Sequence, residues 1–224
     1  MSVKDFIASL KRTPAGMFNP WFHMDGKNDL SAEAPLVRRK QLEAYLSERI
    51  GKARYLFIAE ALGYQGGHFT GIAMTSERIL LGHQREKYAI EPEHVFRSVE
   101  PQRTSRSEIN NLGLSEPTAT IMWGALIDLG FDPYETVLWN SVPWHPYQKS
   151  KGMLSNRTPM RNELRSGLRH LKNFVHLFPG SKVIAVGRKC EESMTELGVN
   201  HVGVRHPANG GAPKFRKQLQ EISR

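Results

Sequence analysis

Residues 54–61, RYLFIAEA, form a nearly continuous apolar run that ends beside a carboxylate, Glu60. A strand buried on both faces has this composition, and such strands are typical of parallel sheets covered by helices. Three other runs have the same character, and they are Thr136–Val142 (TVLWNSV), Lys182–Val186 (KVIAV) and His201–Val204 (HVGV). The sequence therefore predicts four buried strands.

Helical patterns lie between these runs. Residues 115–129 begin at Ser115, a suitable N-cap, and precede Gly130, while residues 159–177 and 188–197 show similar spacing. Strands that alternate with helices form right-handed crossovers around a parallel sheet. The predicted fold class is α/β, a three-layer α/β/α sandwich with a central parallel sheet of about four strands.

The N-terminal quarter has a different pattern. Residues 36–50 (LVRRKQLEAYLSERI) have helical spacing after Ser31 and Pro35, and Gly51 follows them. We predict an N-terminal helical extension over residues 1–52 and an α/β domain over residues 53–224, the two forming one compact unit. The polar segment 82–111 matches no regular element.

The charge is concentrated toward the C-terminus. The 224 residues carry a formal net charge of +9, and residues 149–224 contain 15 Lys and Arg against 5 Asp and Glu. A basic third beside a neutral remainder favours a polyanionic partner, most often nucleic acid. The alternative explanation is a solvated basic face, because charge alone does not determine function.

Other features of composition restrict the class of protein. No segment approaches the roughly 18 apolar residues of a membrane span, and the N-terminus MSVKDFIASLKRT lacks the apolar region of a signal peptide. We expect a soluble, monomeric, cytoplasmic protein without membrane partners, associated with the nucleoid if it is bacterial. The single cysteine, Cys190, excludes an internal disulfide and is expected to be a small buried residue.

Polar side chains follow the predicted strands. Glu60 ends the first strand, Asn140 lies near the end of the second, and His206 follows the fourth. Ligands bind beyond the carboxyl ends of parallel strands, so a carboxylate, an amide and an imidazole are expected to converge there. Each residue alone has a structural explanation as a cap, a salt-bridge partner or a turn former, but the set together predicts a site.

Several common catalytic motifs are missing from the sequence. It contains no G-x-x-x-x-G-K-[ST] or G-x-G-x-x-G phosphate-binding loop, no H-E-x-x-H metal motif and no G-x-S-x-G nucleophile elbow. The histidines are scattered, and His145 in PWHPY is expected to pack or to line a cleft. No metal site is predicted.

The order of motifs resembles that of the uracil-DNA glycosylase superfamily over roughly residues 53–222. Residues 59–63 (AEALG) are similar to the first motif of its iron-sulfur branch, Gly-Glu-Ala-Pro-Gly, and residues 70–76 (TGIAMTS) to that branch's T-G-x-P-F-V-G loop. Asn140 matches the uracil-binding asparagine, residues 156–159 the N-R-x-P segment, and residues 206–208 the His-Pro-Ala motif. The branch's four cluster cysteines are absent, so the resemblance implies no iron-sulfur cluster and no other cofactor.

The resemblance implies a monofunctional DNA glycosylase of base excision repair. Such an enzyme flips a deaminated base, here uracil first of all, out of damaged DNA and hydrolyses its N-glycosidic bond, leaving an abasic site. Glu60 and His206 are the implied catalytic residues. The implied base-binding residues are Gly63, Asn140, and Met74 or Phe69 as the stacking group. The implied DNA-binding residues are Arg157, Arg205, Asn209, Gly210, Gly211 and Lys214.

Two other functions stay open at this point. The first is a glycosylase-like protein that binds DNA or a free base without cutting, which Leu62 supports because it replaces the proline of the first motif. The second is an α/β enzyme that acts on a small nucleoside or nucleotide. Steeply salt-dependent binding to DNA distinguishes the second from the others, because neutralising several phosphates releases counterions.

Overall fold

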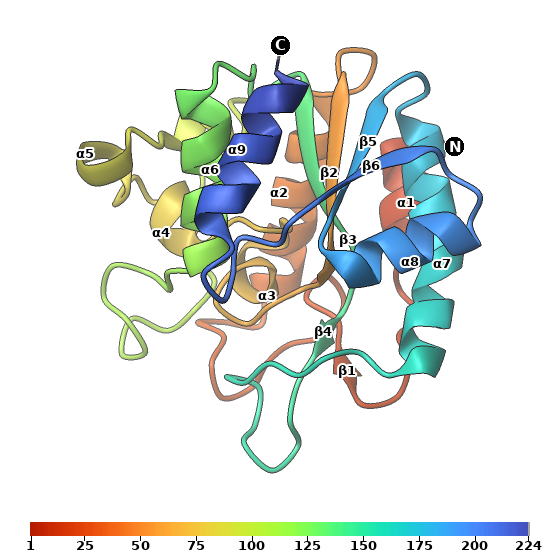
Figure 1. Cartoon of the computed structure of the whole chain (residues 1–224). Helices are drawn as coiled ribbons and strands as arrows, with labels where there is room; N and C mark the ends of the chain where they lie inside the picture. The colour runs from red at the N-terminus through yellow and green to blue at the C-terminus, as the bar shows by residue number, and fades with distance from the viewer. Residues whose placement is uncertain (224) are drawn as a thin grey trace.

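Four parallel strands form the centre of the molecule, in the order β3-β2-β5-β6 (Figure 1). The strands are β2 (Tyr55–Ala61), β3 (Thr136–Val142), β5 (Lys182–Val186) and β6 (His201–Val204). The computed structural model describes residues 1–223, and its four strands confirm the four predicted from the apolar runs. Ile58 on the central strand β2 lies opposite Trp139 on one side and Ala185 on the other.

Helices cover both faces of this sheet. Helices α6 (Pro117–Asp128) and α9 (Ala212–Ile222) lie together on one face, whereas α1 (Val3–Ser9), α7 (Arg161–Leu177) and α8 (Arg188–Glu196) lie on the other (Figure 1). Along the chain, α6 connects β2 to β3, α7 connects β3 to β5, and α8 connects β5 to β6. The predicted three-layer α/β/α sandwich is therefore confirmed.

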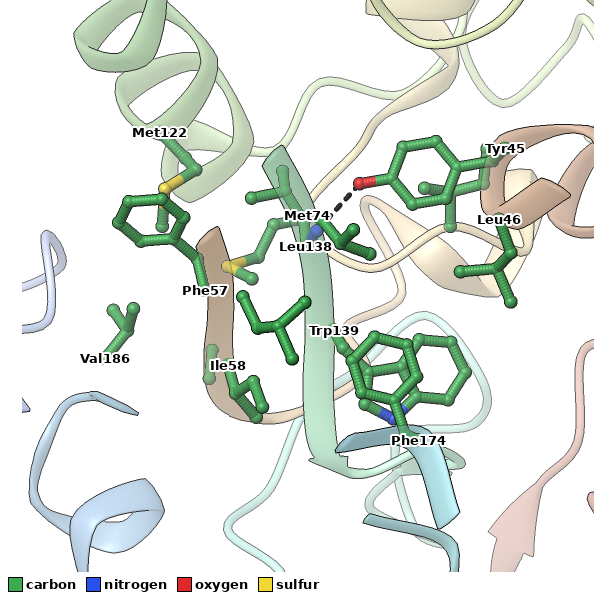
Figure 2. Close-up of a cluster of buried hydrophobic side chains, with 14 of the residues drawn as sticks. Tyr45, Leu46, Phe57, Ile58, Met74, Met122, Leu138, Trp139, Phe174 and Val186 are labelled. Carbon is green, nitrogen blue, oxygen red and sulfur yellow. Dashed lines mark hydrogen bonds between the residues drawn. The ribbon is translucent and has the colours of Figure 1, made fainter. Parts of the chain in front are cut away.

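The N-terminal segment completes the core. Helix α2 (Ala34–Ser47) lies beside the edge strand β3, where the Tyr45 hydroxyl accepts a hydrogen bond of 2.7 Å from the Leu138 N–H (Figure 2). This contact satisfies a backbone donor that an open sheet edge leaves unpaired. Phe6 of α1 packs edge-on against Trp139 at 5.4 Å. Residues before 53 thus share one hydrophobic cluster with the sheet, and the domain boundary at residue 53 stays a prediction.

Short elements occupy the polar segments. They are β1 (Met17–Phe18) paired with β4 (His145–Pro146), the helical turns α3 (Gly67–Thr70), α4 (Glu77–Leu80) and α5 (Arg85–Tyr88), and the 3-10 turn η1 (Pro92–His94). The polar segment 82–111, which matches no regular element in the sequence, is anchored near its end by the buried carboxylate of Glu77. Its Oε1 accepts hydrogen bonds from the backbone N–H groups of Thr104 (2.8 Å) and Ser105 (2.9 Å).

Three details bear on the class of protein. Cys190 is fully buried, as expected from the sequence, and burial raises the pKa of its thiol to about 12. Among residues 1–223, no helix combines the length and the apolar character that a bilayer crossing requires. The same residues contain no group of three or more His, Cys, Asp or Glu side chains arranged to hold a metal ion.

Candidate functional site

A cavity of about 400 Å³ opens at the carboxyl ends of β2 and β3. Its wall is formed by β2 and the loop after it, by β3, by the start of α6 and by the loop before α7. Six of the residues predicted from the sequence line it, and they are Glu60, Gly63, Met74, Asn140, Arg157 and His206. The convergence expected from the strand ends is therefore present.

A second cavity of about 300 Å³ adjoins the first. Both cavities are lined by Glu60 and His206, so these two side chains stand at their boundary. The second cavity is also lined by three cationic residues, Arg188, Lys189 and Arg205. The excess of positive charge in the second cavity favours an anionic ligand group there.

Asn140 presents an unsatisfied amide to the first cavity. Its position on β3, opposite Ala59 of β2, leaves it 2 % exposed. Its Oδ1 is buried and accepts no hydrogen bond from any residue that the structure describes. Buried side-chain amides are almost always hydrogen-bonded, so an unpaired one in a cavity wall is a candidate ligand-binding group.

The environment of His206 fixes which ring nitrogen carries the proton. The backbone N–H of Ala208 donates a hydrogen bond of 3.1 Å to Nδ1, so Nδ1 is the acceptor and the neutral ring is protonated on Nε2. Burial, with a smaller contribution from Arg205, lowers the pKa of His206 below its usual value. At neutral pH this residue is therefore an uncharged donor.

Two glycines shape the backbone around His206. A Cβ atom at Gly211 would lie 2.0 Å from the His206 carbonyl oxygen, and one at Gly187 would lie 3.1 Å from the His206 Cβ. The first distance excludes a side chain at Gly211, and the second leaves room for one at Gly187 only if His206 shifts. The loop after His206 therefore folds back on the histidine, and Asn209 and Gly210 make the turn with φ of +52° and +73°.

Glu60 is a partly buried carboxyl at the boundary of the two cavities. Burial raises its pKa, and the nearby positive charge of Lys189 opposes this rise. Oε1 of Glu60 is buried and finds no hydrogen-bond partner among residues 1–223. The group is available to bind a water molecule or a developing positive charge.

Sequence reasoning missed a second carboxyl, Glu116, in the wall of the first cavity. It occupies the N-cap position of α6, but its side chain makes no capping hydrogen bond. Its Oε2 is buried without a partner in the described part of the chain, and burial raises the pKa of the carboxyl to about 7. The available signal was weak, because Glu116 precedes a proline at a helix start, where acidic residues are common.

Glu116→Gln is expected to stabilise the protein more at pH 8 than at pH 4.5. The folded-state pKa lies above that of the unfolded chain, so protonation of Glu116 stabilises the fold below about pH 4.5, and this contribution is lost as pH rises through about 7. Glutamine does not titrate. The difference in unfolding free energy between variant and wild type should grow by about 3 kcal/mol across this range. Urea unfolding from pH 4.5 to 8 measures it, and a constant difference would place the titration of Glu116 outside this window.

The two candidate stacking residues differ in position. Met74 lines the cavity, but it is 4 % exposed and its side chain lies among Phe57, Ile58 and Leu138 in the hydrophobic cluster (Figure 2). Its φ of +48° is in the left-handed region, which is strained for a residue with a side chain. Phe69 is instead fully buried with its ring 4.3 Å from that of His68. The expectation that Phe69 stacks on a ligand is therefore wrong, because its ring is enclosed by protein.

Arg157 also differs from expectation. The side chain donates to Glu163 through two hydrogen bonds of 2.6 and 2.7 Å, and to the carbonyl oxygens of Tyr147, Thr158 and Gly16. A guanidinium group has five N–H donors, and these contacts use all of them. Arg157 thus holds the loop before α7 in place, and the expected contact with DNA phosphates is corrected to a structural role.

Four of the five remaining DNA-binding candidates are accessible. Arg205, Asn209, Gly210 and Lys214 are exposed on the loop after β6 and on the first turn of α9, whereas Gly211 is buried at the contact with His206. Arg205 and Asn209 line the second cavity. These residues therefore lie beside the part of the site that carries positive charge.

Buried histidines support the loop before α7, which forms part of the cavity wall. His145 Nε2 donates to the Ser155 carbonyl at 2.8 Å, and its Nδ1 lies 2.9 Å from His68 Nδ1. His68 Nε2 is 3.2 Å from Asp25. His145 therefore packs rather than lining the cavity, and it fixes the loop that carries Asn156 and Arg157.

Comparison with known proteins shows the fold. No protein-family model matches the sequence, and no curated protein matches it. The structure is similar to the crystal structure of wild-type SMUG2 from Pedobacter heparinus, with a TM-score of 0.59 and 12 % sequence identity, covering 99 % of this chain and 97 % of that chain. The similarity thus extends over nearly the whole of both chains, including residues 1–52, and the chain has a uracil-DNA glycosylase-like fold.

Proposed function

We propose that this protein is a monofunctional DNA glycosylase that removes a deaminated base from DNA. The observation that carries the proposal is the meeting of Asn140, Glu60 and His206 at one cavity, with the histidine held as a neutral Nε2–H donor. These are the groups that recognition and release of such a base require. The fold shared with SMUG2, a glycosylase of the uracil-DNA glycosylase superfamily, supports the same function.

The chemistry begins with the base outside the helix, because the glycosidic bond is inaccessible in stacked DNA. Arg205 and Lys214 hold phosphates near the second cavity, which positions the strand without sequence preference. The flipped base enters the first cavity. There the amide of Asn140 supplies a donor for O4 and an acceptor for the N3–H of uracil, a pattern that cytosine does not match.

Cleavage places positive character on the sugar and negative charge on the departing base. His206 Nε2–H donates to O2 and stabilises the charge on the base, a contribution of about 3 kcal/mol for a preorganised donor in a dry site. Glu60 orients a water molecule toward C1′ and stabilises the sugar cation. The water oxygen forms the new bond to C1′, its proton passes to Glu60, and the base leaves as the anion.

The test is an excision assay with labelled oligonucleotides containing uracil, hypoxanthine or xanthine, followed by alkali to cut at abasic sites. Strand cleavage by the wild-type protein that is greatly reduced in His206→Ala supports the proposal. If none of the oligonucleotides is cut but binding is salt-sensitive, the protein binds DNA without cutting. Weak, salt-insensitive binding favours an enzyme of small nucleosides or nucleotides.

A further inference from the structure

The cavity wall contains a carboxyl, that of Glu116, which the proposed function does not use. Asn140 reaches the cavity from β3, and His206 reaches it from the loop after β6. Glu116 reaches it from a third direction, the start of α6, the helix that covers one face of the sheet (Figure 1). A ligand in the cavity therefore meets polar groups from three separate elements.

The glycine-rich loop after β2 packs directly on the carboxyl of Glu116. A Cβ atom at Gly66 would lie 2.1 Å from Oε2, and one at Gly63 would lie 3.3 Å from Oε1. The loop approaches this closely because both positions lack a side chain. The loop encloses the carboxyl yet gives it no donor, since Oε2 has no hydrogen-bond partner in residues 1–223. Glu116 therefore serves neither as a salt-bridge partner nor as a helix cap among the described residues.

The enclosed carboxyl is a donor at neutral and lower pH. With a pKa of about 7, raised by burial, the Glu116 carboxyl is about half protonated at pH 7 and carries its proton at lower pH. A protonated carboxyl has an O–H donor in addition to its acceptor oxygen. It can thus hydrogen-bond to an acceptor on a ligand, which an ordinary glutamate cannot do.

Uracil leaves this donor without a partner. Asn140 accounts for O4 and N3–H of that base, and His206 accounts for O2. The rest of the ring edge, C5–H and C6–H, offers no acceptor. A polar group buried against this edge without a partner costs binding energy, so uracil satisfies the cavity only in part.

We infer that Glu116 is a third base-binding residue, which donates a hydrogen bond to an acceptor on the ring edge that Asn140 and His206 leave free. The inference rests on the proposed function and specifies its substrate class. The preferred substrates are damaged bases with such an acceptor. Two kinds of base supply it: a deaminated purine through N7, or a pyrimidine with a polar substituent at C5.

Matched pairs of substrates test this inference. Hypoxanthine is paired with 7-deazahypoxanthine, which lacks N7, and 5-formyluracil is paired with uracil. Single-turnover excision is measured for the wild-type protein, Glu116→Gln and Glu116→Leu at pH 6 to 8.5. The two members of a pair differ in intrinsic reactivity. We therefore compare the ratio of variant rate to wild-type rate on one member with the same ratio on the other.

Glu116→Leu should slow excision of the acceptor-bearing member about tenfold relative to its partner, as expected for one lost hydrogen bond. The wild-type rate on the acceptor-bearing member should fall above pH 7 as the carboxyl ionises. Glu116→Gln should not show this fall, because an amide donates at any pH. An effect in one pair alone identifies that kind of base as the substrate.

Equal losses on both members of each pair would overturn the inference and leave Glu116 a structural residue. The same fall above pH 7 in Glu116→Gln would also overturn it. If the wild-type protein cuts no substrate, the proposed function fails, and binding decides the inference. Affinities are then measured for oligonucleotides that carry the same bases on 2′-fluoro nucleotides, which resist hydrolysis. The wild-type protein should bind the acceptor-bearing member of a pair about tenfold more tightly than its partner, and Glu116→Leu should remove this difference. Equal wild-type affinities within each pair would show that the inference is wrong.

Discussion

His206→Ala is expected to slow base excision by about a hundredfold or more while DNA affinity stays nearly unchanged. The protein holds the His206 ring in one protonation state. Its Nδ1 accepts the Ala208 N–H, burial lowers its pKa, and the proton is therefore on Nε2 without a positive charge. Such a donor stabilises the leaving anion, a charge that is absent from the bound substrate. The loss therefore appears in the rate and not in binding.

Arg205→Ala is the matched control for this variant. Arg205 precedes the histidine on the same loop, its side chain is exposed, and its backbone N–H contact with Gln218 survives the substitution. It should weaken DNA binding and reduce the salt slope by about one, without changing the rate at saturating protein. Single-turnover rates and salt-dependent affinities separate the two effects. Equal losses of rate and affinity in His206→Ala would show that the histidine supports the loop instead.

The sequence predicted the sheet and its edge well because both depend on local patterns. Buried parallel strands require unbroken apolar runs, and each of the four runs became a strand. Their shared direction then placed Glu60, Asn140 and His206 at one edge without knowledge of the packing. That step required only the order of strands and helices along the chain.

The sequence predicted side-chain partners less well because these depend on packing between distant segments. Arg157 belongs to a motif that the resemblance linked to DNA, yet Glu163 and three carbonyl groups occupy it fully. Phe69 has the right chemistry for stacking, but the turn α3 directs it into the interior beside His68. Neither outcome follows from residue type or spacing.

Glu116 is a candidate site residue that the sequence did not predict, for the same reason. A glutamate before a proline at a helix start is typical of an ordinary first turn. Only the packing of the loop at Gly63 and Gly66 over the carboxyl buries its Oε2 in the cavity wall. The sequence shows the two glycines, but it does not show that the carboxyl of Glu116 packs against them. Glycine-rich loops beside a predicted site therefore merit a search for a buried polar partner.

Asn140→Asp is expected to reduce uracil excision at pH 8 on the order of a thousandfold, because a site built to hydrogen-bond a base loses much of its affinity for the transition state when one donor is removed. The amide nitrogen that donates to O4 is replaced by an oxygen. When ionised, that oxygen places a negative charge against an acceptor in a position that is 2 % exposed. The change in volume is small, so the effect reports hydrogen bonding and not packing.

The pH dependence of this variant distinguishes binding to the base from a structural role. Burial raises the pKa of a carboxyl, and a protonated carboxyl has one donor and one acceptor, as the amide does. Excision by Asn140→Asp should therefore recover as the pH is lowered from 8 to 5.5, whereas the wild-type rate should show no such recovery. Single-turnover rates on uracil over this range, with circular dichroism to confirm folding, provide the measurement. A loss that is the same at every pH would indicate disrupted packing of β3, and an unchanged rate at pH 8 would remove Asn140 from the site.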